Sequence, residues 1–214
     1  EPGKGYCGSR SCCSIRSSVT SVSSFVSGSE AGRRSSAITR TSSSSAPGVS
    51  LGSLRHYFTS QSDLLAFSMR MISDRVKERI ANIKLSGDIR ADCETLIEEL
   101  LPMDADRRNE SEIWLAFTGR RLVDPKLAEL NAQVYDELYS LFLKLVRAIV
   151  RYREAVAGAP CGLDAELEAR RLNALVDGLV VHAVSRPDVM TPGMIRSIVR
   201  RHLDGLLPEA EEGE

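Results

Sequence analysis

Residues 48–65 read GVSLGSLRHYFTSQSDLL, and the interpretation of the whole chain starts from this stretch. Gly48 suits the left-handed backbone found where one helix ends and another begins. Leu54 and Phe58 are four residues apart, so they lie on one face of a helix and can anchor it to a small core. Ser60 and Asp63 form a capping-box pattern that opens an apolar run. The stretch therefore predicts a tight turn, a short helix and a longer helix.

The outward face of the short helix carries groups that suit DNA. Gly52 allows close approach of the backbone, while Ser53 and Tyr57 offer hydroxyl groups. Arg55 can pair with a phosphate, or with guanine in a major groove that is wide enough for one helix. Sequence-specific DNA binding is therefore the leading hypothesis.

The order Gly-Val-Ser-x-Gly-x-Leu-x-His-Tyr-Phe, followed by Ser-x-x-Asp-Leu-Leu, resembles the TetR family of bacterial repressors. Two positions depart from the family pattern, which usually has an aromatic residue in place of Arg55 and a lysine in place of Gln61. The resemblance implies that Leu51, Gly52, Ser53 and His56 face base edges, and that Ser53, Arg55, Tyr57 and Gln61 lie along the phosphates.

Composition sets the outer limits of the interpretation. The chain has 214 residues, of which 43% are hydrophobic and 27% charged, which is typical of a globular protein with a real core. No apolar run is long enough for a membrane helix, and the start lacks the order of a signal peptide, so we expect a cytoplasmic protein without a membrane partner. Residues 1–62 hold seven Lys/Arg against two acids, and this basic front is compatible with DNA.

The sequence offers little for catalysis or metal binding. Its five cysteines are Cys7, Cys12, Cys13, Cys93 and Cys161, and they lack the paired spacing of a structural zinc site. There is no nucleophile elbow, no glycine-rich phosphate loop and no carboxylate–histidine metal pattern. We predict that the protein is not an enzyme and uses no metal or cofactor.

Residues 1–47 do not match the two helices that the TetR resemblance requires ahead of the turn. They are dominated by Ser, Gly and Arg, although their number is about right. Two interpretations stay open: a segment translated out of frame, or a natural disordered segment. The predicted organisation is residues 1–47 as this segment, 48–62 as the remaining helix-turn-helix, 63–206 as a ligand-binding and dimerisation domain, and 207–214 as an acidic tail.

From residue 60 onwards apolar residues recur at helical spacing. The pattern predicts helices over 60–84, 88–101, 104–122, 125–153, 163–185 and 192–206. Gly87 and Pro102 are the expected breaks, and Asp124 and Thr191 precede prolines at the first helical position. No stretch has strand alternation, so the fold class is all-α and TetR-like.

The resemblance continues in the C-terminal part of the chain. Three segments are similar to the BetI-type ligand domain: residues 110–117, 121–127 and 175–182. This similarity implies a small-molecule effector that moves the connecting helix, which is the helix predicted over residues 60–84. Aromatic residues with a polar handle suit an adaptable pocket, although core packing is the alternative for each one. The candidate pocket residues are Met103, Trp114, Phe117, Tyr135, Tyr139 and Phe142, with His182 as a further candidate.

The last two predicted helices have broad apolar faces, which an antiparallel pairing with a second copy would cover. Ordinary core packing is the alternative. The candidate dimer interface is Leu172, Leu175, Leu179, His182, Ile195, Ile198, Val199 and Leu203. The sequence thus predicts a homodimeric repressor that binds a palindromic operator and is released by a small molecule. The alternative is a dimeric ligand-binding protein with a degenerate DNA-binding domain.

Overall fold

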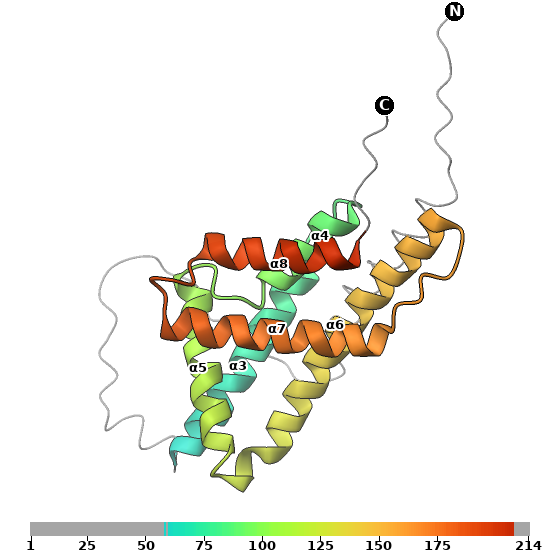
Figure 1. Ribbon diagram of the computed structural model, residues 1–214. Helices are drawn as coiled ribbons and strands as arrows, with labels where there is room; N and C mark the ends of the chain where they lie inside the picture. Colours follow the sequence, from blue (N-terminus) through green and yellow to red (C-terminus); the bar gives the residue numbers. More distant parts are fainter. Residues whose placement is uncertain (1–57, 59, 208–214) are drawn as a thin grey trace, which may run out of the picture.

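A computed structural model describes Phe58 and residues 60–207, and these residues are all-α with no strand among them. Figure 1 shows the helices in chain order. They are α3 (Gln61–Ala81), α4 (Ile89–Glu98), α5 (Ala105–Arg121), the 3-10 helix η1 (Pro125–Leu127), α6 (Ala128–Ala157), α7 (Ala165–Ser185) and α8 (Pro192–Leu206).

Most of the described helices begin at side-chain caps, and the sequence predicted those at Ser60, Asp124 and Thr191. The helix expected from Pro125 instead starts with η1, and α6 follows it without a side-chain cap. The Ser60 hydroxyl accepts a hydrogen bond from the Asp63 amide at 3.1 Å, which starts α3. Asp88 and Asp104 cap α4 and α5 in the same way, and Thr191 caps α8 just before the proline. Each cap satisfies an amide that has no partner within the helix, so these starts are fixed by local sequence.

Several helix ends differ from the prediction. Helix α3 ends at Ala81 instead of residue 84, and Gly87, with φ of 91°, lies in the loop that follows. Helix α4 ends at Glu98 instead of residue 101, whereas α6 continues to Ala157 and stops at Gly158 in the left-handed conformation. Apolar residues 83, 85, 100 and 101 still pack against the core from the loops, so apolar spacing alone overstated the lengths of α3 and α4.

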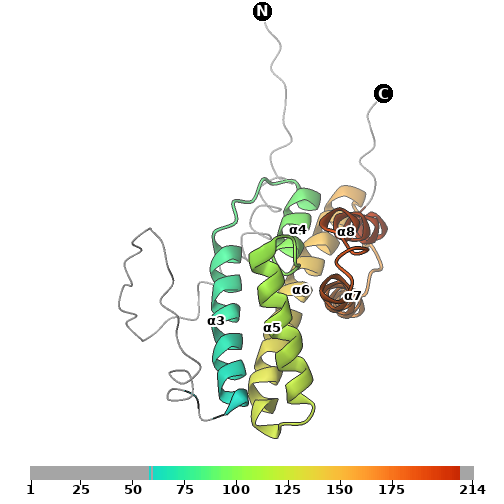
Figure 2. The ribbon, with the colours of Figure 1, turned by 90° about the vertical axis from the view of Figure 1, so that its left-hand side faces the viewer.

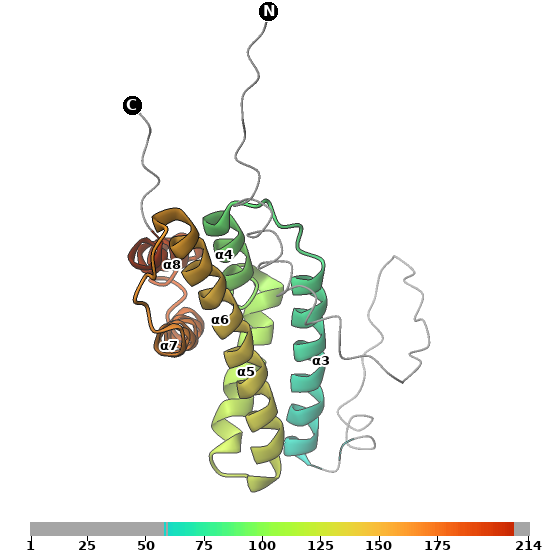
Figure 3. The same ribbon diagram turned by 90° about the vertical axis from the view of Figure 1, so that its right-hand side faces the viewer.

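The helices form a layered body. Figure 2 shows α3 on one side, α7 and α8 nearly end-on on the opposite side, and α5 and α6 between them; Figure 3 shows the same order from the other side. Helix α3 packs on α5, α7 packs on α6, and α8 packs on α4. The connecting helix α3 is therefore separated from α7 and α8 by the middle layer.

The core has two parts. The larger part joins α4, α6, α7 and α8 around fully buried side chains such as Leu101, Phe142, Ile149, Leu172 and Ile195. The smaller part lies where α3 meets α5, η1 and the start of α6, around Met69, Ile72, Phe117, Leu127, Leu130 and Val134. No helix in the described part of the chain is long and apolar enough to cross a membrane.

Candidate functional site

A cavity of about 420 Å³ lies among α3, α5, α6 and α7. Its walls are mainly apolar, with Ile72 and Val76 from α3, Trp114 from α5, Phe142 from α6 and Val180 from α7. This volume falls in the range of small-molecule sites, which are usually apolar cavities with a few polar groups. The cavity is therefore the candidate ligand site.

One wall of the cavity belongs to helix α3. The α3 residues that line it recur at helical spacing, so a single face of the helix is turned toward the cavity: Met69, Ile72, Ser73, Val76, Lys77 and Ile80. A molecule that fills the cavity therefore touches α3 along about three of its turns.

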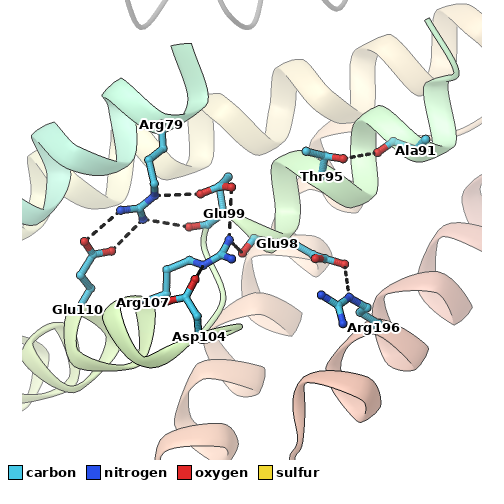
Figure 4. A network of polar contacts seen from close by, with 9 residues as sticks. All are labelled: Arg79, Ala91, Thr95, Glu98, Glu99, Asp104, Arg107, Glu110 and Arg196. Carbon is cyan, nitrogen blue, oxygen red and sulfur yellow. Dashed lines mark hydrogen bonds and ion pairs between the residues drawn. The ribbon is translucent and has the colours of Figure 1, made fainter. Parts of the chain in front are cut away.

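A second wall is polar and includes Glu99 and Glu110. Arg79 binds both of these side chains, as Figure 4 shows. The Arg79 guanidinium donates to both carboxylate oxygens of Glu110 on α5, at 3.0 and 2.8 Å. It also donates to the side chain and the backbone carbonyl of Glu99, at 2.9 and 3.3 Å. Charge-assisted bidentate pairs of this kind are among the stronger hydrogen bonds in proteins. The hydrogen bond with Glu110 is the largest cause of the raised pKa of Arg79. We call Arg79, Glu99 and Glu110 the arginine clamp.

Arg107 extends this wall toward α4. Its guanidinium lies 3.3 Å from the Glu99 carboxylate and donates to the Glu98 carbonyl at 3.1 Å. The Arg107 guanidinium also pairs with the Asp104 side chain, and the Arg107 amide donates a hydrogen bond to it. The hydrogen bond from the amide is the largest cause of the lowered pKa of Asp104. Glu98 in turn accepts from Arg196 on α8 at 3.0 Å. The network in Figure 4 thus connects α3 with α4, α5 and α8.

The remaining charged groups on the walls come from α3, α6 and α7. Lys77 and Glu137 form an ion pair at 2.8 Å. Burial lowers the pKa of Lys144 on α6. Burial raises the pKa of Asp177 on α7 to about 6, so this carboxyl group is mainly ionised at pH 7.

The N-terminal end of α3 is held by a second group of hydrogen bonds, centred on Ser62. The Ser62 hydroxyl donates to the Asp124 carboxylate, and the Arg120 guanidinium donates to the Ser62 oxygen at 3.2 Å. Asp124 also accepts from the Lys126 amide, and the hydrogen bond from Ser62 is the largest cause of its lowered pKa. The start of α3 is therefore attached to the turn between α5 and η1.

The structure brings two of the predicted pocket residues to the cavity. Trp114 and Phe142 line it. Met103 and Phe117 are packed in the two parts of the core, Tyr135 is 45% exposed, and Tyr139 lies against Arg170 at 4.6 Å. His182 is exposed on α7.

A search pattern of aromatic residues does not include the polar lining of the cavity. The missed residues were charged side chains set at core-facing positions, such as Glu110 and Asp177. Asp177 was detectable in principle, because it is an isolated acid within the apolar run Leu175–Val181.

The predicted interface residues are placed mainly inside the protomer. Leu172, Leu179, Ile195, Val199 and Leu203 are buried in the chain's own core, so they are not available to a second copy while the protomer stays folded. Leu175 and Ile198 are partly exposed, and His182 is exposed. The apolar spacing identified a buried face of α7 and α8, and that face packs on α6 and α4.

Most of the predicted DNA-contacting residues lie outside the described part of the structure: Leu51, Gly52, Ser53, Arg55, His56 and Tyr57. Gln61 is described, and it is the exposed first residue of α3.

The described residues thus form a helical body with a mainly apolar cavity against α3. Residues 89–208 match the family model described as the C-terminal domain of BetI-type transcriptional repressors. The chain therefore belongs to the TetR family, with a BetI-type C-terminal domain.

Named relatives agree with this family. The chain is 29% identical over 163 residues to the HTH-type transcriptional regulator PksA of Bacillus subtilis (strain 168), which covers 76% of each chain. It is 28% identical to the HTH-type transcriptional regulator BetI 2 of Chromohalobacter salexigens, over 75% of this chain and 74% of that one. The crystal structure of a transcriptional regulator from Rhodococcus sp. Rha1 superposes with a TM-score of 0.62 at 26% identity, covering 78% of this chain and 83% of the other. The protein is thus a DNA-binding transcriptional regulator, and these relatives are all named as transcriptional regulators.

Proposed function

We propose that the protein is a cytoplasmic repressor that binds a palindromic operator as a homodimer and is released when a small molecule enters the cavity. The observation that carries this proposal is the position of the cavity, because six side chains of α3 line it. Helix α3 begins directly after the TetR-like stretch that ends near residue 58. A change in the cavity therefore acts on the helix that follows the DNA-binding segment.

Release of the protein from the operator follows from the spacing of its two recognition helices. Two recognition helices related by a two-fold axis fit successive major grooves only when they are about 34 Å apart. A ligand that pushes against Ile72 or Val76 displaces α3 from the face it now covers, and this displacement changes the spacing of the two recognition helices. The ligand lowers the affinity for the operator by no more than its own preference for the displaced arrangement of α3.

The proposed dimer uses the outward faces of α7 and α8, which lie together on the side of the body away from α3 (Figure 2). Leu167, Val181 and Met194 are 54%, 41% and 48% exposed there. Ala174 and Gly178 lie on the same face of α7 as Leu167 and Val181, and such small residues allow a close approach of helices. These residues replace the buried members of the predicted interface, and pairing with a second copy makes a four-helix contact.

The proposed DNA interface is residues 51–57 together with Gln61, as the family resemblance implies. An electrophoretic shift assay on DNA from upstream of the protein's own gene tests it. We expect sequence-specific binding that weakens as salt rises, because Arg55 neutralises a phosphate and releases its counterions. A duplex with one half-site scrambled is the matched control. Arg55→Ala is expected to weaken binding to both duplexes alike and to reduce the salt dependence of binding.

Two results would contradict the repressor. Equal binding to the intact and the scrambled duplex would exclude a palindromic operator. If the dimeric protein does not bind DNA even at low salt, the alternative of a ligand-binding protein with a degenerate DNA-binding domain is favoured. Residues 1–47 bear on the second result. Sequencing the encoding DNA shows whether another frame over these codons encodes an amphipathic helix pair, and a chain repaired in that way should then regain binding.

A further inference from the structure

The cavity contains four acidic side chains, and three of them have a cationic partner. Glu99 pairs with Arg79 and Arg107, Glu110 pairs with Arg79, and Glu137 pairs with Lys77. The fourth is Asp177 on α7. Within residues 60–207 it makes no ion pair and no hydrogen bond through its side chain, so it is the one acid of the lining without a counter-charge.

Charged groups face the cavity from every element around Asp177. Helix α3 supplies Lys77, the α4–α5 loop supplies Glu99, α5 supplies Arg107 and Glu110, and α6 supplies Glu137 and Lys144. Lys77 and Arg107 are already paired with carboxylates. The ammonium nitrogen of Lys144 is buried, and Lys144 has an interaction of its own.

These groups leave the Asp177 carboxylate uncompensated. Burial is the cause of its raised pKa, and no neighbouring cation offsets that effect. Val176 and Val180 of the same helix also line the cavity, whose walls as a whole are mainly apolar. An ionised group in such a place lowers the stability of the empty protein, and a bound cation removes that penalty.

We propose that Asp177 selects a cationic ligand: a mainly apolar molecule carrying one protonated amine, whose ammonium group donates hydrogen bonds to the carboxylate while its apolar part fills the cavity beside Trp114. This inference rests on the proposed role of the cavity as the ligand site. An anionic ligand finds its possible partners already engaged, and an uncharged ligand buries the carboxylate without a partner, which is costly.

Three probes of equal chain length separate these cases: n-octylamine, 1-octanol and octanoate. Trp114 is the only tryptophan of the chain and lines the cavity, so its fluorescence reports binding by the full-length protein. We expect n-octylamine to bind about 10- to 100-fold more tightly than 1-octanol at pH 7.5, the range expected for a charge-assisted hydrogen bond.

Variants assign that preference to one side chain. Asp177→Asn should reduce the ratio of the two affinities to about one while 1-octanol still binds, and Asp177→Glu should keep a preference for the amine. Asp136→Asn removes the same charge from an exposed position of α6 outside the cavity and should leave the ratio unchanged. Circular dichroism of each variant checks that it is folded.

The pH dependence provides a second readout. The amine stays protonated throughout the range, so its affinity should be constant above about pH 7 and should fall below pH 6 as Asp177 takes up a proton. The affinity of 1-octanol should not follow this curve. Equal binding of amine and alcohol, tightest binding of octanoate, or an amine preference that survives Asp177→Asn would each overturn the proposal.

The two proposals fail in different experiments. The probe measurements need no DNA, so the ligand preference can hold even if the operator assay fails. Conversely, specific operator binding combined with equal affinities for the three probes would reject the role of Asp177 and leave the regulator intact.

Discussion

Replacing Arg79 by methionine removes the guanidinium of the arginine clamp but keeps a side chain of similar length. In the native protein this group makes a bidentate contact with Glu110 and two hydrogen bonds with Glu99. Glu99 keeps Arg107 as a partner in the variant, whereas Glu110, whose side chain is only 11% exposed, loses its cation. The main effect of Arg79→Met is therefore one poorly solvated carboxylate without a partner.

The expected cost follows from the burial of the two partners. Removing one member of a buried ion pair costs about 3 to 5 kcal/mol, and solvent reduces this figure because the Arg79 side chain is 31% exposed. We expect a loss of about 2 to 3 kcal/mol in the free energy of unfolding. For a chain of this size that loss corresponds to a decrease of about 5 to 10 °C in the melting temperature.

Urea unfolding followed by circular dichroism measures this loss. Arg75→Met is the matched control, because Arg75 is exposed on the same helix, and its effect should stay within about 0.5 kcal/mol. Adding Glu110→Gln to Arg79→Met removes the unpaired charge, so the double variant should be more stable than Arg79→Met by about 1 to 2 kcal/mol. Two results would refute the reasoning: equal losses in the free energy of unfolding for Arg79→Met and Arg75→Met, or a double variant that is less stable than Arg79→Met.

Four further outcomes are expected from the structure. Asp177→Asn should stabilise the ligand-free protein by about 1 to 2 kcal/mol at pH 7.5, after allowance for solvent, because the folded pKa of about 6 exceeds the ordinary 3.8. In urea titrations this gain should shrink as the pH falls from 6 to 4, because the wild-type carboxyl group also becomes neutral there. Asp104→Ala should cost about 1 kcal/mol at pH 7 through the lost cap of α5. Because the pKa of Asp104 is lowered, its contribution should persist in acid until the pH falls below the ordinary value, which a urea series from pH 7 to 3 checks. Leu172→Ala should destabilise the fold by about 2 to 5 kcal/mol as a cavity in the core, whereas Val181→Asp should leave the protomer folded and dissociate the dimer in sedimentation experiments.

The sequence predicted the starts of the helices better than their ends. A start such as Ser60 or Asp104 depends on one side chain and an amide three residues away, so the signal is local. The end of α3 depends on tertiary packing: Ile83 leaves the helix and still reaches the core from the loop. Apolar periodicity does not distinguish these two ways of burying a side chain.

The site was predicted less completely for a related physical reason. Periodicity shows that a face of α7 is apolar, but the same pattern arises whether Leu172 packs on α6 or on a second copy. The charged lining of the cavity depends on pairs such as Arg79 and Glu110, which are 31 residues apart. Such pairs are visible only after the helices have been placed.

The two attachments of α3 give this helix the mechanics of a lever. The arginine clamp holds α3 near its C-terminal end, and the hydrogen bond between Ser62 and Asp124 holds its N-terminal end. Ile72 lies seven residues from Arg79 and Gln61 lies eighteen, so at about 1.5 Å per residue a sideways displacement at Ile72 grows about two and a half times by Gln61. We expect the hydrogen bonds of Ser62 to oppose this motion, so that a ligand displaces the start of α3 only after they break.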